Sequence, residues 1–265
     1  MRLIEGIFSG RSRNGEAKAA QSWSKNGSML MNTRSAGLAA VLLVCASFLP
    51  VQEAAARVGA KAPAVVELYT AQGCAGCPDA AAGLKGVQAR KDVLFLTFAV
   101  DYWDYLGWKD TFAKPEFTAR QNAYKARFRL REIYTPQVVV DGRKETSGAD
   151  HAKVEALADD HAPAGRRLHL VLKGQRLKVS GRAAPEGVQL WLIRYDPHAR
   201  EVQVKSGENR GKTVVEQNLV RELVDLGRFK GAARSLTLPA PTEPGLATAV
   251  IAQGARGGPV LAVAR

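Results

Sequence analysis

Two cysteines, Cys74 and Cys77, are the residues whose spacing most clearly predicts chemistry. They stand in the segment Cys74-Ala75-Gly76-Cys77-Pro78 and are the only cysteines after residue 56. Two thiols at this spacing can cycle between a dithiol and a disulfide and exchange disulfides with another molecule. We expect Cys74 to be the attacking thiolate and Cys77 the resolving thiol.

The same spacing forms half of a structural zinc site, which needs four ligands. The histidines are remote in sequence and include no spaced pair: His151, His161, His169 and His198. We therefore expect no metal site and no resident cofactor. Two alternatives stay open, a metal-handling protein that binds Cu(I) through both thiolates and a non-enzymatic binding protein with a vestigial motif.

The elements around the motif place Cys74 between a strand and a helix. Residues 64–70 form a short, apolar, β-branched run that is typical of a buried strand, and residues 71–73 break it. Pro78 and Asp79 favour the first turn of a helix. The positive end of that helix is expected to lower the pKa of the Cys74 thiol below about 8.5.

Two further segments are expected to reach the same edge of the sheet. A second buried strand, residues 92–100, ends at Asp101 and is expected to run parallel to the first. A hairpin strand at 137–140, closed by Asp141-Gly142, runs the other way, so its start at Thr135-Pro136 returns to this edge. We predict Pro136 to be cis, with the Thr135 backbone beside the sulfurs; an ordinary trans proline is the alternative.

Further candidate site residues flank these elements. Glu67 lies in the apolar strand before Cys74, where it is either a buried proton shuttle for Cys77 or an edge-exposed glutamate. The loop after residue 100 is rich in acids and aromatics that either line a substrate groove or simply pack against the domain. Its candidate substrate-binding residues are Asp101, Tyr102, Trp103, Asp104, Tyr105 and Trp108.

Four separated motifs, at 66–78, 100–110, 134–137 and 207–211, make the chain resemble one family of secreted bacterial proteins. This is the domain-of-unknown-function 1223 family, within the thioredoxin-like superfamily. The resemblance spans about residues 62–265 and implies a thioredoxin-like domain with a C-terminal β-domain, but no established reaction. Unlike thioredoxin, the chain has no proline between its cysteines, which leaves redox poise and substrate open.

The pattern changes after about residue 165, which predicts two domains. Residues 62–161 are expected to form a thioredoxin-like α/β domain, a mixed sheet flanked by helices. Residues 166–265 contain several short alternating runs with Gly and Pro turns and are expected to form an all-β sandwich, with one helix at 218–226. A polar turn at Glu208-Asn209-Arg210 favours a surface hairpin over a docking role.

The beginning of the chain predicts export. Residues 36–49 form an apolar run after a short basic stretch, and Ala54-Ala55-Ala56 suits signal peptidase. We expect residues 1–56 to be a leader and a cleaved signal peptide rather than a membrane anchor, because a spanning helix needs roughly 20 residues. The protein is therefore expected in the periplasm without stable membrane insertion, an oxidising location that suits a cycling disulfide.

The charge balance bears on partners. The net charge is +13, but Lys and Arg are scattered rather than gathered into a stripe, so we expect no nucleic-acid partner. The cysteine pair instead predicts a protein thiol or disulfide substrate, or a redox partner. The sequence gives no indication of the oligomeric state.

Overall fold

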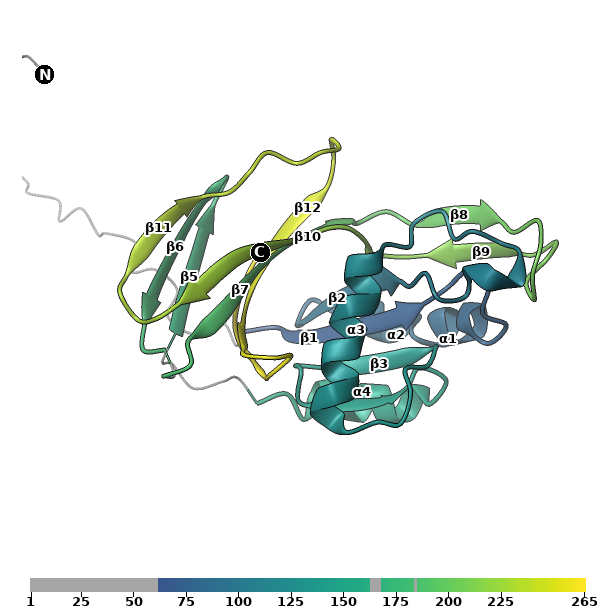
Figure 1. Ribbon diagram of the computed structural model, residues 1–265, viewed down its shortest axis with the longest axis horizontal. Helices are drawn as coiled ribbons and strands as arrows, with labels where there is room; N and C mark the ends of the chain where they lie inside the picture. Colours follow the sequence, from purple (N-terminus) through teal and green to yellow (C-terminus); the bar gives the residue numbers. More distant parts are fainter. Residues whose placement is uncertain (1–61, 163–167, 184) are drawn as a thin grey trace, which may run out of the picture. The chain divides into compact units, whose positions relative to one another are not determined.

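The computed structural model describes residues 62–162, 168–183 and 185–265. The expected leader and signal peptide, residues 1–56, lie outside the described residues, as does residue 166, where the second domain is expected to begin. The described residues form a mixed α/β fold with an eight-stranded sheet, a three-stranded sheet and a two-stranded hairpin (Figure 1). No helix in the described ranges is long and apolar enough to cross a membrane.

The first part of the chain supplies one half of the large sheet and all the helices described. Its elements are β1 (Ala64–Thr70), α1 (Cys77–Gly83), α2 (Lys85–Gln88), β2 (Val93–Ala99), the 3-10 turn η1 (Asp104–Leu106), α3 (Pro115–Phe128), β3 (Gln137–Val140), β4 (Lys144–Ser147) and α4 (His151–Asp159). β1 pairs in parallel with β2 and antiparallel with β3. The sequence predictions for these strands are thereby confirmed.

Burial on both faces explains why β1 and β2 read as continuous apolar runs. All residues of both strands are buried, as is usual where helices cover both sides of a parallel pair. One face packs on Phe117 and Tyr124 of α3, and the other packs on Leu84, Val87 and Val154 from the segments of α1, α2 and α4. These two cores fix the end of β1, from which the cysteine motif emerges.

The second part of the chain extends the same sheet. Its strands are β5 (Leu168–Lys173), β6 (Arg176–Gly181), β7 (Val188–Asp196), β8 (Arg200–Gln203), β9 (Thr213–Glu216), β10 (Leu219–Phe229), β11 (Arg234–Thr237), β12 (Ala247–Gly254) and β13 (Val260–Ala264). β10 lies beside β2, so the strand order is β13-β12-β7-β10-β2-β1-β3-β4. The segments expected as separate domains, 62–161 and 166–265, therefore share one sheet.

A second layer covers part of the extended sheet. The antiparallel strands β5, β6 and β11 form the three-stranded sheet, seen on the far side from the helices in Figure 1. Leu177 and Val179 of β6 share a buried core with Leu190 and Leu192 of β7. The alternating apolar residues of this segment thus face a common core between two sheets.

The helix expected at residues 218–226 is wrong: this segment belongs to the long strand β10. The register of β10 against β7 shifts between Val220 and Glu222 and again between Asp225 and Arg228. Each irregularity disturbs the period-two alternation of a strand. The resulting spacing of Leu219, Leu223 and Leu226 imitates one face of a helix.

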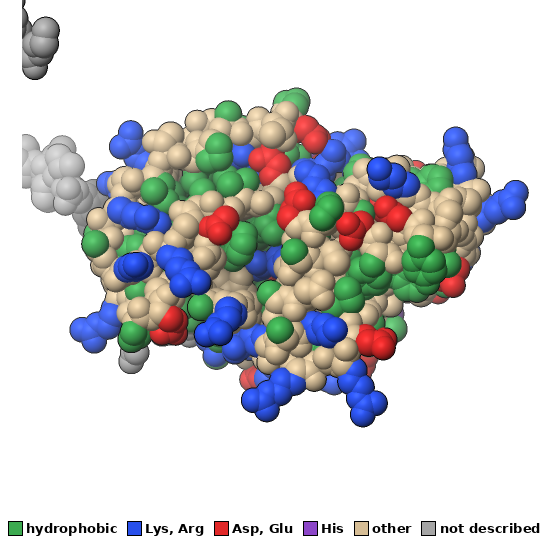
Figure 2. All heavy atoms as spheres, viewed as in Figure 1, with side chains coloured by type: hydrophobic (Ala, Val, Ile, Leu, Met, Phe, Trp, Pro, Cys, Tyr) green, Lys and Arg blue, Asp and Glu red, His purple; other side chains and the backbone are tan. Residues whose placement is uncertain are grey.

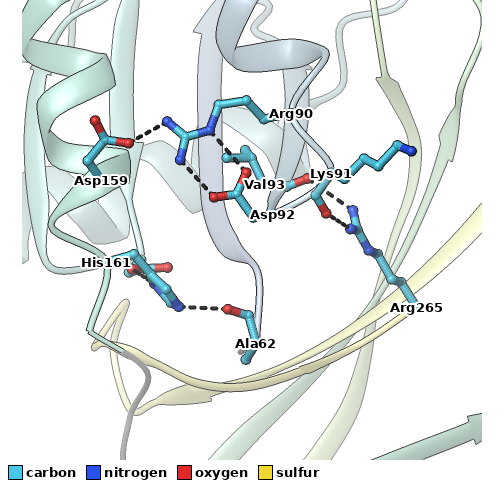
Figure 3. Close-up of polar contacts among 9 residues, drawn as sticks. Ala62, Arg90, Lys91, Asp92, Val93, Asp159, His161 and Arg265 are labelled. Carbon is cyan, nitrogen blue, oxygen red and sulfur yellow. Dashed lines mark hydrogen bonds and ion pairs between the residues drawn. The ribbon is translucent and has the colours of Figure 1, made fainter. Parts of the chain in front are cut away.

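Polar contacts tie the chain ends of the described region to the sheet (Figure 3). The Arg265 guanidinium donates to the carbonyl oxygens of Val93 and Lys91, at 3.0 and 2.5 Å. The His161 ring lies between Ala62 and Asp141, with Nε2 2.8 Å from the Ala62 carbonyl oxygen. Both ring nitrogens of His161 therefore make contacts that stabilise the fold.

Candidate functional site

Cys74 and Cys77 form a disulfide at the end of β1. Their Cα atoms are 5.4 Å apart, within the usual range for a disulfide. Both cysteines are buried, at 3% and 1% exposure, whereas Ala75 and Gly76 between them are exposed. α1 begins at Cys77, so Cys74 lies in the turn that leads into the helix. The exposed part of the motif is therefore Ala75-Gly76.

The segment that opens β3 lies against the motif. The Thr135-Pro136 peptide bond is cis, which confirms that prediction. A Cβ atom built on Gly76 would lie 3.9 Å from Cδ of Pro136. The motif turn and the start of β3 are therefore neighbours.

The aromatic loop also reaches this edge of the sheet. Trp103 Nε1 donates to Oγ1 of Thr135 at 2.7 Å, and a Cβ atom built on Gly73 would lie 3.5 Å from Cβ of Trp103. Trp108 Nε1 donates to Oε1 of Gln72 at 3.0 Å. The three sequence-distant segments thus converge, with both tryptophans beside the motif.

The remaining residues of this loop divide into two groups. The carboxylate of Asp101 accepts from Thr118 Oγ1 at 2.6 Å, and that of Asp104 accepts from the Asp110 backbone N–H at 3.0 Å. These acids hold the loop together. Tyr102 is half-buried and burial raises its pKa, whereas Tyr105 is 79% exposed.

Glu67 is fully buried, so the edge-exposed alternative is wrong. Its carboxylate forms an ion pair with Arg120 at 2.7 Å and accepts hydrogen bonds from the hydroxyls of Tyr69 and Tyr124 at 2.8 and 2.7 Å. Burial raises the pKa of both tyrosines, and the Glu67 charge adds to the rise. Glu67 is the centre of a polar network that joins β1 to α3. A proton shuttle to Cys77 stays a prediction.

The sequence missed a contact between the β8–β9 hairpin loop and the motif. Asn209 is fully buried, and its Nδ2 donates to the carbonyl oxygens of Gln72 at 2.9 Å and Cys74 at 2.7 Å. The Glu208 carboxylate accepts from the Ala75 backbone N–H at 3.1 Å. The surface-hairpin interpretation of this turn is therefore wrong for Asn209, although Arg210 is exposed.

Two buried carboxyl groups, those of Asp110 and Glu216, lie near Gln72, which precedes the motif by two residues. Asp110 accepts from the backbone N–H of Gln72 at 2.7 Å. Glu216, at the end of β9, is 2% exposed and lies near the side chains of Gln72 and Asp110. Burial raises the pKa of Glu216 to about 8, and the nearby Asp110 charge contributes. Burial also raises the pKa of Asp110, despite its backbone hydrogen bonds. Sequence reasoning missed both groups.

Other features of the described residues do not add a metal centre. Among the described residues, no group of three or more His, Cys, Asp and Glu side chains could hold a metal ion.

A cavity of about 300 Å³ lies between α3 and the strands β7, β10 and β12, and its lining includes Arg120, Trp191 and Leu223. The cysteine motif is not part of that lining.

The fold and the site together define a mixed α/β protein with a buried Cys-x-x-Cys disulfide. The chain belongs to the DUF1223 family, described as proteins of unknown function, whose model matches residues 65–253. No curated protein matches the chain.

Two solved structures are similar. The crystal structure of protein AGR_C_4864 from Agrobacterium tumefaciens is 27% identical, with a TM-score of 0.61, over 78% of this chain and 95% of that one. HBP35 of Porphyromonas gingivalis is 12% identical, with a TM-score of 0.52, over 78% of this chain and 75% of that one. The second similarity concerns the fold alone.

Proposed function

We propose that the protein is an exported thiol-disulfide oxidoreductase with a thioredoxin-like core. The observation that carries this proposal is the Cys74–Cys77 disulfide at the end of β1, beside the cis Thr135-Pro136 bond. The parallel β1 and β2, joined through α1 and α2 and followed by antiparallel β3, support a thioredoxin-like arrangement. The shared core between β6 and β7 supports a β-sandwich in the C-terminal part.

The cysteine pair can transfer two electrons without a cofactor. In the reducing direction, the Cys74 thiolate attacks one sulfur of a substrate disulfide, and the substrate S–S bond breaks as a mixed disulfide forms. The substrate thiolate that leaves takes up a proton. Cys77 then loses its proton and attacks Cys74, which forms the Cys74–Cys77 bond and releases the second substrate thiol. The oxidising direction is the reverse sequence.

The surroundings of the motif supply a contact surface for a polypeptide. Trp103, Trp108 and Thr135 lie beside the cysteines, and aromatic side chains provide large apolar contact area with a polar end. We propose that a protein thiol or disulfide, or a redox partner, docks here. Asp101 and Asp104 hold this loop in place, and Tyr102 and Tyr105 flank the contact.

The periplasm is the proposed location, because the predicted signal peptide leads there and no stable membrane insertion is expected after its removal. On the face shown in Figure 2, Lys and Arg side chains are spread among acidic and apolar ones. This distribution supports a protein partner over a nucleic acid, which would favour a basic stripe.

A trapping experiment tests the proposed order of attack. Cys77→Ser removes the resolving thiol. A mixed disulfide between Cys74 and a model protein, which has been reduced and then reoxidised so that it contains disulfides, should therefore accumulate. Dithiothreitol should release it. Cys74→Ser is the matched variant and should trap little, because the more buried Cys77 would have to attack. Equal trapping by both variants would contradict the assignment, and trapping by neither would contradict the proposed function.

A further inference from the structure

The β8–β9 hairpin places a carboxylate on the backbone of the cysteine motif. Glu208 Oε2 lies 3.1 Å from the backbone nitrogen of Ala75, the residue that follows Cys74. Only the carbonyl group of Cys74 separates this nitrogen from the Cys74 Cα. The carboxylate is therefore held on the backbone directly after Cys74.

The position of Glu208 is fixed by its neighbours in the loop. Asn209 is fully buried and donates to the carbonyl oxygens of Gln72 and Cys74. Gly207, with φ of +76°, packs beside Leu106 and Trp108. The loop is thus attached on both sides of Glu208. These attachments hold the backbone of Glu208 next to the motif.

We propose that Glu208 tunes the redox equilibrium of the cysteine pair by opposing formation of the Cys74 thiolate. Like charges close together destabilise each other, and stabilising the thiolate form makes a cysteine pair a stronger oxidant. A carboxylate at this place has the opposite effect: it favours the disulfide and makes the pair more reducing. Glu208 is a positioning residue, and this inference rests on the proposed function.

Other charged groups meet at the same junction. Asp110 accepts from the Gln72 backbone N–H, Glu216 lies close to Asp110 on β9, and Lys212 Nζ donates to Oδ1 of Asn209. Asp79 lies in the first turn of α1. Arg210, which follows Asn209 in the loop, is exposed. All of them are unchanged when Glu208 alone is altered, so a comparison of single variants isolates its charge.

Two measurements on the full chain test the proposal. The first is equilibration with glutathione, in which two glutathione thiols are oxidised to one disulfide as Cys74 and Cys77 are reduced. The second is the pH at which alkylation of reduced Cys74 is half-maximal. Both are read from the tryptic peptide that carries Cys74 and Cys77, which keeps Cys45 out of the signal. The variants are Glu208→Gln, Glu208→Asp and, as a control on the same hairpin, the exposed Glu201→Gln.

Glu208→Gln keeps an oxygen that can accept from Ala75 and removes only the charge. Because Glu208 is exposed, we expect a modest effect: the equilibrium should shift about threefold toward the reduced pair, about 15 mV for a two-electron couple. Alkylation should move to lower pH. Both changes should shrink at high salt, because salt screens exposed charges. Glu208→Asp and Glu201→Gln should stay close to wild type.

The outcomes separate this inference from the proposed function. An unchanged alkylation profile in Glu208→Gln, or an equal change in Glu201→Gln, would overturn the role of Glu208. A wild-type pair that never forms a disulfide would instead overturn the proposed function. The alkylation profile of the reduced protein would still decide the role of Glu208 in that case.

Discussion

At the scale of single residues, the buried Glu67–Arg120 pair shows what the sequence could and could not indicate. The apolar run around Glu67 made burial one of two alternatives, and burial is what the structure has. Its partner Arg120 lies in α3 and is buried there together with Phe117 and Tyr124. Nothing local in either segment pairs them, because the contact depends on how α3 lies across β1.

We predict that Glu67→Gln destabilises the protein by about 3–5 kcal/mol, because it leaves the Arg120 charge buried without its counterion. Arg120→Met should cost a similar amount, and the double variant should cost clearly less than the sum. Urea unfolding measures these free energies. The exposed pair Lys144–Asp160 offers a control, and Lys144→Met should change stability little. Additive losses in the double variant would contradict the coupling.

At the scale of elements, local chemistry predicted the first part of the chain better than the second. The strand before the motif, the helix that starts at the motif and the Asp141-Gly142 turn all lie where the sequence indicates. Both turn residues have positive φ, as an Asp-Gly hairpin turn requires. β10 was misread because its irregular register hides the alternation of a strand. β9 was missed, although Val214 and Glu216 alternate onto one buried face.

The buried Glu216 on β9 predicts a pH dependence of stability. Its pKa rises from 4.5 to about 8 on folding, so between these values the folded protein keeps a proton that the unfolded chain has released. Stability therefore falls as the pH rises from about 4.5 to 8. Glu216→Gln should remove this loss and stabilise the protein by roughly 1–3 kcal/mol at pH 8 relative to its effect at pH 4.5.

Urea unfolding at both pH values measures this difference. Glu201→Gln, on the exposed side of the same hairpin, should show no such dependence. An equal effect of Glu216→Gln at the two pH values would contradict an ionisable, buried Glu216.

At the scale of the whole molecule, the two parts of the chain are joined by contacts that no local pattern could indicate. β10 pairs with β2 within the large sheet, and the loop after β8 docks on the cysteine motif through Asn209. Both contacts link residues more than a hundred positions apart. Hydrophobic period and turn residues describe neighbours along the chain, so they leave such contacts undetermined.

Asn209 tests the connection between the hairpin and the motif. Asn209→Ala leaves the carbonyl oxygens of Gln72 and Cys74 without this donor, which should destabilise the protein by about 1–3 kcal/mol. The loop should also become more sensitive to proteolysis between β8 and β9. Asn122→Ala is the control, because that side chain only reaches Thr118 on the surface of α3. Unchanged proteolysis in Asn209→Ala would show that other contacts hold the loop.

The proposed function requires that Cys74 and Cys77 interconvert reversibly between a disulfide and a dithiol. The most direct test is to equilibrate the full chain over a series of glutathione ratios and quantify both states in the peptide that carries the pair. We predict a complete, reversible transition with a reduction potential between about −120 and −270 mV, the range of known thiol-disulfide oxidoreductases. A pair that does not follow the glutathione ratio, or that never forms the intramolecular disulfide, would contradict the account.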